Sequence, residues 1–150
     1  MLPVSSEIKP RILAVDDDRS LGETLRHYLS DTFYVEHVET PRAALEALYG
    51  SKFDGVLLDM QLPEVSGMQL LKIIRAKYPD TAVVMFTANN DPKTIVEAIK
   101  AGAYEYVVKD TPNLEMEITF RLSQAIENER LRGRAQKLEA KAIQLIKRYE

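Results

Sequence analysis

Five short apolar segments alternate along the chain with segments of helical periodicity. The apolar segments are residues 11–15, 34–38, 56–58, 82–86 and 104–108. Four of them are nearly continuous, which is typical of parallel strands buried on both faces, whereas residues 34–38 alternate weakly. Between them, apolar residues recur three or four positions apart, as at Leu21, Leu25 and Leu29. This order predicts an α/β fold with a parallel sheet.

The boundaries of the predicted helices carry ordinary start and stop signals. Thr40 followed by Pro41 indicates an N-cap and the first helical position, and Gly50 ends that helix. The last helix begins after Pro112 and has no strong stop signal before the C-terminus. The pattern shows neither an internal repeat nor a low-complexity stretch.

Composition narrows the possible classes of protein. A length of 150 residues with 45% hydrophobic and 29% charged residues suits one globular domain. No apolar run approaches the roughly 20 residues of a membrane-spanning helix, and the N-terminus lacks a signal-peptide pattern. The absence of cysteine excludes disulfides and thiolate metal sites. We therefore expect a cytoplasmic protein, and the net charge of −3 gives no reason to expect nucleic-acid binding.

Polar residues follow the apolar segments at the points where the strands should end. They are Asp16, Asp17 and Asp18 after the first strand, Asp59 after the third, Thr87 after the fourth and Lys109 after the fifth. Ligands of open α/β sheets bind outside the carboxyl ends of the strands. Taken singly, each residue has a plainer reading as a turn, cap or solvated side chain. Their common position predicts a single site.

The residue types indicate phosphoryl chemistry at that site. Clustered carboxylates repel one another, and an all-oxygen site of this kind suits Mg²⁺. A carboxylate such as Asp59 can act as a nucleophile and form an aspartyl phosphate. Lys109 could neutralise the transferred group, and the Thr87 hydroxyl could donate a hydrogen bond to it.

Several segments together resemble bacterial response-regulator receiver domains. Residues 12–17 (Ile-Leu-Ala-Val-Asp-Asp) resemble the acidic motif of that family, and residues 56–67, from Val56 to Gly67, resemble its phosphoacceptor loop. Thr87-Ala88 and residues 101–109, which end in Tyr-Glu-Tyr-Val-Val-Lys, complete the pattern. The resemblance covers roughly residues 10–127. It implies a flavodoxin-like, doubly wound (βα)5 fold with strand order 2-1-3-4-5, a pattern for which a receiver is among the general examples.

The resemblance also implies roles for individual residues. Asp59 would be the phosphoacceptor, and a sensor histidine kinase or a phosphotransfer protein would be the donor. Asp17, Asp59 and the backbone carbonyl of Gln61 would bind Mg²⁺ directly, with Asp16 acting through a water molecule. Lys109 would pair with Asp59 or the phosphoryl group. Thr87 and Tyr106 would be the switch residues, with Thr87 moving toward the phosphate and Tyr106 turning inward behind it.

One position departs from the family pattern. Receivers usually have a proline after this lysine, joined by a cis bond, whereas Asp110 follows Lys109 here. A cis bond without proline costs about 3–4 kcal/mol, so we expect a trans Lys109–Asp110 bond. The direction in which the Lys109 side chain points then depends on a loop whose geometry differs from that of the family.

The helical pattern continues beyond the expected end of the receiver. We divide the chain into an N-terminal extension (residues 1–9), a receiver (10–127) and a helical linker (128–150). The linker carries an a/d-type series: Leu131, Ala135, Leu138, Ala142, Leu145 and Tyr149. Two readings stay open, a solvated linker helix or a short dimeric coiled coil.

The coiled-coil reading makes a specific prediction about orientation. Extended backward, the series places Asn128 at an a position, which suits a two-stranded register. A parallel pair would place Glu127 against Arg132 and Arg134 against Glu139 of the other helix. We therefore expect a parallel homodimer through residues 128–149.

Two functional hypotheses follow. In the first, the receiver regulates an attached output domain, and the charged linker resembles those that join receivers to the ATPase domains of enhancer-binding transcription activators. In the second, the receiver acts alone on partners or carries a phosphoryl group in a relay. An enzyme such as a dehalogenase-like phosphatase is disfavoured because Gln61 replaces its second aspartate. A dinucleotide-binding domain lacks support because the first strand leads into aspartates instead of glycines.

Overall fold

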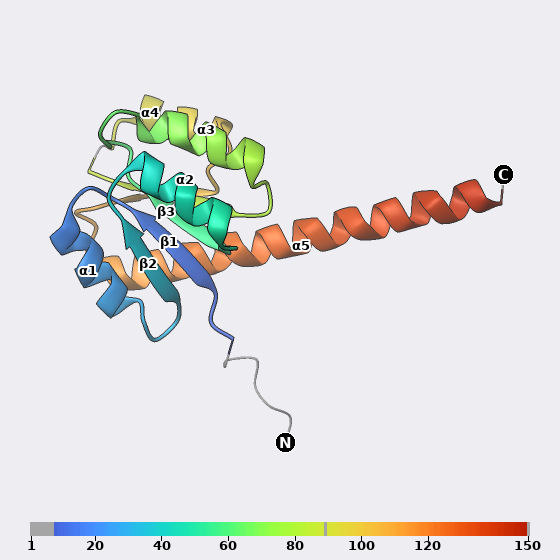
Figure 1. Ribbon diagram of the computed structural model, residues 1–150, viewed down its shortest axis with the longest axis horizontal. Coiled ribbons are helices and arrows are strands. Elements are labelled where there is room, and N and C mark those ends of the chain that lie inside the picture. Colours follow the sequence, from blue (N-terminus) through green and yellow to red (C-terminus); the bar gives the residue numbers. More distant parts are fainter. Residues whose placement is uncertain (1–7, 89, 150) are drawn as a thin grey trace, which may run out of the picture.

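The computed structural model describes residues 8–88 and 90–149, so most of the expected N-terminal extension lies outside the described residues. Within them, five strands alternate with five helices (Figure 1). The elements are β1 Arg11–Val15, α1 Arg19–Tyr28, β2 Tyr34–Val38, α2 Pro41–Gly50, β3 Gly55–Leu58, α3 Gly67–Lys77, β4 Ala82–Thr87, α4 Pro92–Lys100, β5 Glu105–Val108 and α5 Leu114–Arg148. The Thr40 hydroxyl accepts a hydrogen bond from Ala43 N at the start of α2, as its sequence predicts.

The strands form one parallel sheet in the order β2-β1-β3-β4-β5, which confirms the predicted flavodoxin-like topology. Register places the strand ends level with one another. Val15 of β1 pairs with Leu58 of β3, and Thr87 of β4 pairs with Val108 of β5. The residues that follow these positions therefore emerge along one edge of the sheet.

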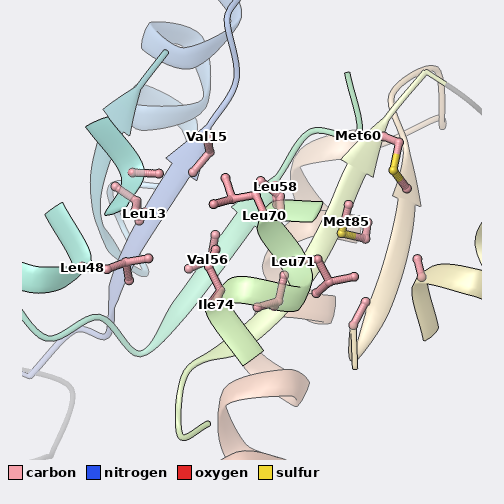
Figure 2. Packing of buried hydrophobic residues seen from close by; sticks show 14 of the residues in the cluster. Leu13, Val15, Leu48, Val56, Leu58, Met60, Leu70, Leu71, Ile74 and Met85 are labelled. Atoms are coloured by element: carbon pink, nitrogen blue, oxygen red, sulfur yellow. The ribbon is translucent and has the colours of Figure 1, made fainter. Parts of the chain in front are cut away.

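Alternation along the strands divides the apolar side chains between two faces. On one face, Leu13, Val56 and Val83 pack against helices α2, α3 and α4 (Figure 2). On the other face, the strand residues that alternate with those of the first cluster pack against α1 and α5. The members of this second cluster include Ile12, Leu57, Val84, Leu25, Leu29, Ile118 and Leu122. Helices cover both faces, which explains why the central strands read as continuous apolar runs.

Helix α5 is one continuous helix of 35 residues that leaves the domain and projects far beyond it (Figure 1). Its first turns are anchored by the buried residues Ile118, Leu122, Ala125 and Ile126. Beyond Gly133 every described residue is exposed. None of the helices in the described residues is both long and apolar enough to cross a membrane.

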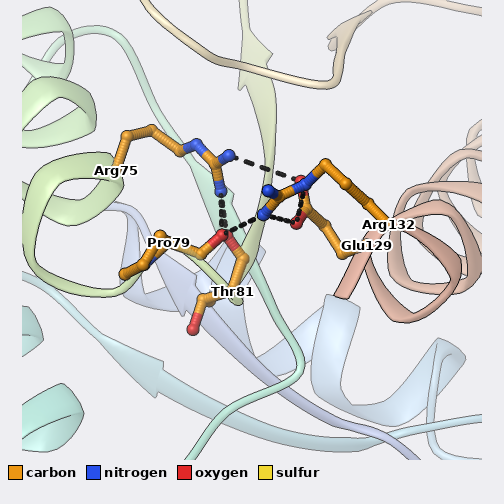
Figure 3. Close-up of polar contacts among 5 residues, drawn as sticks. All are labelled: Arg75, Pro79, Thr81, Glu129 and Arg132. Atoms are coloured by element: carbon orange, nitrogen blue, oxygen red, sulfur yellow. Dashed lines mark hydrogen bonds and ion pairs between the residues drawn. The ribbon is translucent and has the colours of Figure 1, made fainter. Parts of the chain in front are cut away.

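A polar cluster fixes α5 at the point where it leaves the domain (Figure 3). Glu129 of α5 accepts from Arg75 of α3 at 3.3 Å and from Arg132 at 2.7 Å. The two guanidinium groups also donate to backbone carbonyls of the α3–β4 loop: Arg75 to Pro79 and Thr81, and Arg132 to Pro79. The Glu129 side chain is only 12% exposed, so this is a partly buried network that ties α5 to α3.

These contacts change the expected role of two residues in the helical linker. The Asn128 amide nitrogen donates to the Tyr104 hydroxyl and to the Gln124 carbonyl oxygen, so the side chain is engaged within its own domain. Arg132 is likewise engaged with Glu129 and Pro79. Its expected pairing with Glu127 of a second helix therefore competes with contacts inside the chain. Contacts between α5 and the domain extend past residue 127.

Candidate functional site

Three carboxylates lie together at the carboxyl edge of the sheet. Asp16 and Asp17 follow β1 and Asp59 follows β3, and one oxygen from each lies within 4.8 Å of the others. Asp16 and Asp59 are buried, with 2% and 5% of their surface exposed, whereas Asp17 is exposed. The buried pair is held by strand geometry, because Asp59 N donates to Val15 O at 3.0 Å and Asp16 N donates to Val38 O at 3.1 Å.

Lys109 joins the two buried carboxylates. Its Nζ atom lies 2.7 Å from Asp16 Oδ2 and 3.2 Å from Asp59 Oδ2. The backbone sets this direction, since Lys109 N donates to Thr87 O at 2.9 Å. No peptide bond in the described residues is cis, so the Lys109–Asp110 bond is trans as predicted. The replacement of proline by Asp110 therefore leaves the ammonium group aimed at the site.

The cluster suits a divalent cation. Three carboxylates face one ammonium group, which leaves an excess of negative charge. Asp16 Oδ2 is buried and accepts no well-formed hydrogen bond from the described residues. It is paired instead with the ammonium group of Lys109. An oxygen-rich site with uncompensated charge is the kind that Mg²⁺ or Ca²⁺ occupies. The three carboxylates are the ones that the sequence predicted to lie together at this edge of the sheet.

Burial and charge shift the proton affinities of the central pair. Burial raises the pKa of Asp59 above its usual value, and the nearby charge of Asp16 acts in the same direction. The hydrogen bond from Gln61 N and the charge of Lys109 oppose this rise. For Lys109, burial lowers the pKa, but its contacts with Asp16 and Asp59 outweigh burial and raise it overall. Lys109 is therefore a permanent cation at neutral pH.

The two expected switch residues flank this cluster. Thr87 is the last residue of β4 and is buried, with 1% of its surface exposed. Tyr106 of β5 is half-buried against the apolar cluster that lies between the sheet and helices α2, α3 and α4. Burial raises the pKa of the Tyr106 hydroxyl, and the charges of Asp59 and Asp91 add to the effect. The tyrosine thus lies within electrostatic range of Asp59.

The loop after Asp59 is held by a close approach that the sequence pattern did not predict. Gln61 N donates to Asp59 Oδ1 at 3.2 Å, and Gly67 N donates to Met60 O at 2.8 Å. A Cβ atom on Gly67 would lie 2.1 Å from the carbonyl oxygen of Asp59. Only glycine lets the start of α3 lie this close to the loop. The sequence signal was Gly67 itself, the last residue of the segment that resembles the phosphoacceptor loop of the family.

Asp18, the third aspartate of the run, is not part of the cluster. Its Oδ1 atom accepts from Leu21 N at 3.1 Å and so caps helix α1. Its backbone N–H also donates to Asp16 Oδ1 at 2.9 Å, which fixes one oxygen of that carboxylate. The plainer reading of a lone aspartate after a strand therefore holds for Asp18.

Comparison with known proteins agrees with this geometry. The family described as "Response regulator receiver domain" matches residues 12–121. Response regulator MprA of Mycolicibacterium vanbaalenii is 35% identical over 100 residues, which cover 66% of this chain and 43% of that protein. Regulatory protein AtoC of Escherichia coli is 36% identical over 104 residues, which cover 66% of this chain and 22% of that protein. The matched region thus spans less than half the length of these relatives.

Solved structures share the fold over most of the chain. The signal receiver domain of an HD domain-containing protein from Pseudomonas fluorescens Pf-5 superposes with a TM-score of 0.75 at 30% identity, covering 82% of this chain and 98% of its own. The BeF3-activated receiver domain of DrrB gives a TM-score of 0.72 at 26% identity, covering 80% and 99%.

Proposed function

Because this chain belongs to the response regulator receiver domain family, the signalling module of two-component systems, we propose that it accepts a phosphoryl group on Asp59. The donor would be a sensor histidine kinase or a phosphotransfer protein. A receiver is a signalling module rather than an enzyme with a separate substrate, and its chemistry is confined to its own phosphorylation and dephosphorylation.

One observation carries this proposal. Asp59 stands at the end of β3 with Lys109 Nζ at 3.2 Å, and the carboxylates of Asp16 and Asp17 lie within cation-binding distance of it. Asp59 Oδ2 faces the ammonium group, and Oδ1 accepts from Gln61 N. The carboxylate is thus oriented on both oxygens beside an ammonium group and a potential cation site.

The proposed step is an in-line transfer. An oxygen of Asp59 attacks the phosphorus of a phosphohistidine, an O–P bond forms, and the N–P bond breaks as the electron pair returns to the imidazole ring. Lys109 remains protonated and neutralises the phosphoryl oxygens. We propose that the Thr87 hydroxyl donates to one of those oxygens and that Tyr106 turns inward behind Thr87.

The residues present fit Mg²⁺, with Asp17, Asp59 and the Gln61 carbonyl as direct ligands and Asp16 acting through water. When bound, the cation would neutralise charge on the phosphoryl oxygens and help to align them. The chain should gain one phosphoryl group from acetyl phosphate in the presence of Mg²⁺. A chelator should abolish that gain. Equal labelling with and without the cation would contradict the role of the carboxylate cluster.

An output domain can respond to phosphorylation only if the change at Asp59 is transmitted out of the receiver. Helix α5 projects from the receiver, and this projection supports the presence of an attached output domain. A stand-alone receiver has no need of a helix that projects beyond its last buried residue, Ile126. The matched relatives are longer regulatory proteins, two of which carry the printed descriptions "regulatory protein" and "response regulator". We propose that the output is regulatory, with transcription as the class suggested by the linker composition. We expect the module to work in the cytoplasm without contacting nucleic acid itself.

We also propose that the projecting part of α5 forms a parallel homodimer. Leu131, Leu138 and Leu145 follow the d positions of a heptad repeat and are 50%, 63% and 42% exposed in the single chain. Burying a leucine side chain contributes about 1.5–3 kcal/mol, so three such residues on each helix can drive association. Arg134 and Glu139 occupy g and e positions that attract one another in a parallel pair. Asn128 is left out of this seam because Tyr104 holds it.

Light scattering tests the dimer. Leu138→Lys should convert a dimer into a monomer, because it places a charge in the seam. Gln144→Lys, a matched substitution at an outer position of the same helix, should leave the dimer intact. A wild-type chain that is monomeric at tens of micromolar would refute the homodimer and leave α5 as a solvated linker. A dimer that survives Leu138→Lys would place the contact on the receiver instead.

A further inference from the structure

His37 lies on the edge strand β2, and its side chain reaches the loop that carries two of the clustered carboxylates. Its Nε2 atom lies 2.8 Å from the backbone carbonyl oxygen of Asp16. Because a carbonyl oxygen can only accept, Nε2 carries the hydrogen and donates it. This carbonyl belongs to the planar peptide group that joins Asp16 to Asp17. The hydrogen bond therefore fixes the orientation of the peptide plane that leads into Asp17.

The other polar groups of Asp16 are anchored separately. Its backbone N donates to Val38 O, its Oδ1 accepts from Asp18 N, and its Oδ2 pairs with Lys109. These contacts fix the strand end and the Asp16 side chain. In the described part of the chain, the contact from His37 is the one that reaches the carbonyl side of Asp16, toward Asp17. Since Asp17 is exposed, the direction of its carboxylate depends on that backbone.

The imidazole ring occupies the space that a side chain on helix α1 would need. A Cβ atom on Gly22 would lie 2.3 Å from Nδ1, Cε1 and Nε2 of His37. A glycine inside a helix costs about 1 kcal/mol relative to alanine. Here that cost has a local reason, because the ring lies directly against the helix backbone. Gly22 leaves room for the imidazole ring, and His37 supplies the Nε2–H donor, so the two residues act together.

We propose that His37, seated on Gly22, is a positioning residue for the acidic cluster. It holds the Asp16–Asp17 peptide so that the Asp17 carboxylate stays within reach of Asp59 for a shared divalent cation. The proposal rests on the proposed function in one respect, namely that the cluster binds a cation. His37 acts through a backbone group and is not itself a catalytic residue.

Hydrogen bonds from outside a ligand set orient the ligands, and removing one typically weakens metal binding by about 10- to 100-fold. Two substitutions separate this effect from simple packing. His37→Phe keeps an aromatic ring of similar size on Gly22 but removes the donor. His37→Gln removes the ring but keeps an N–H group of comparable reach. A purely structural role for the ring predicts that phenylalanine is the better replacement, whereas a positioning role predicts that glutamine is.

The test is the Mg²⁺ affinity of the full chain, measured by titration of its backbone amide resonances. We expect His37→Phe to weaken Mg²⁺ binding about 10-fold and His37→Gln to stay within about threefold of the wild type. A folded His37→Phe chain that binds Mg²⁺ as tightly as the wild type overturns the proposal. A wild-type chain without Mg²⁺ affinity instead contradicts the proposed function, so the two failures are distinguishable.

Two further measurements keep the proposal testable if His37→Phe does not fold. Gly22→Ala leaves His37 in the chain but pushes its ring away from Asp16, and it should weaken Mg²⁺ binding as His37→Phe does. Unchanged affinity in Gly22→Ala would overturn the proposal. In the wild type, nitrogen–proton correlation spectra of the imidazole report its tautomer. The contact requires a hydrogen on Nε2, and a ring protonated at Nδ1 alone would equally overturn the proposal.

Discussion

Lys109 Nζ lies closer to Asp16 than to Asp59, at 2.7 Å from Asp16 Oδ2 against 3.2 Å from Asp59 Oδ2. Lys109→Ala should therefore leave Asp16 buried without its ion-pair partner. We expect a loss of about 1–3 kcal/mol in the free energy of unfolding in metal-free buffer. Mg²⁺ should restore part of that loss. Urea unfolding with and without Mg²⁺ checks this, with the exposed Lys72→Ala as the control, and an unchanged stability for Lys109→Ala would show that the pair contributes nothing.

Asp59 should destabilise the metal-free fold at neutral pH. Burial raises its pKa, so the folded state disfavours the carboxylate. The stabilising contribution of such a group is full below its unfolded-state pKa and is lost as the pH rises through the folded-state pKa. Asp59→Asn should thus increase the free energy of unfolding at pH 7, and the gain should disappear as the pH falls below the ordinary pKa of an aspartate.

Thermal unfolding of Asp59→Asn across this pH range, without divalent cations, provides the measurement. The exposed Asp31→Asn removes the same charge from the surface and should change little. A destabilised Asp59→Asn chain at pH 7 would mean that the contacts of Asp59 with Lys109 and Gln61 outweigh the cost of its burial.

Gly67→Ala should damage the loop that joins Asp59 to helix α3. The added Cβ would meet the Asp59 carbonyl oxygen at 2.1 Å, and backbone atoms cannot move aside cheaply. Overpacking of this kind costs about 1–3 kcal/mol. Gly50→Ala is the matched control, because a Cβ there meets nothing within 4 Å and should be neutral or stabilising. Urea unfolding measures both, and a Gly67→Ala chain as stable as Gly50→Ala would contradict the close approach.

Glu129→Gln should loosen α5 where it leaves the domain. The substitution keeps the shape of the side chain but removes the charge that Arg75 and Arg132 share. We expect a loss of about 1–2 kcal/mol in stability, together with faster amide exchange around residue 129. The exposed Glu139→Gln should change neither quantity. Unaltered exchange in Glu129→Gln would show that apolar packing alone holds the helix.

The sequence predicted the fold and most of the cluster because both depend on strand ends. Continuous apolar runs identified four of the strands, and parallel register placed Asp16, Asp59 and Lys109 along one edge. Strand order came from the family resemblance. The substitution of Asp110 for proline left the direction of Lys109 open, since that direction depends on the hydrogen bond from Lys109 N to the Thr87 carbonyl.

Contacts between distant segments could not be predicted in this way. His37 and Gly22 meet across a strand and a helix, and only the unusual glycine inside a periodic helical segment hinted at a close neighbour. Glu129 and Asn128 were assigned to a coiled-coil linker because heptad spacing continues backward past the point where α5 rests on the domain. Periodicity reports which residues share a helix face but does not report where a domain surface covers that face.

The proposal that Asp59 is the phosphoacceptor is tested most directly by identifying the residue that becomes phosphorylated. Wild-type chain, Asp59→Asn and the exposed-site control Asp31→Asn are incubated with acetyl phosphate and Mg²⁺, and their intact masses are compared. The wild type and Asp31→Asn should each gain one phosphoryl group, and Asp59→Asn should gain none. Equal phosphorylation of Asp59→Asn and the wild type would contradict the assignment of Asp59 as the phosphoacceptor.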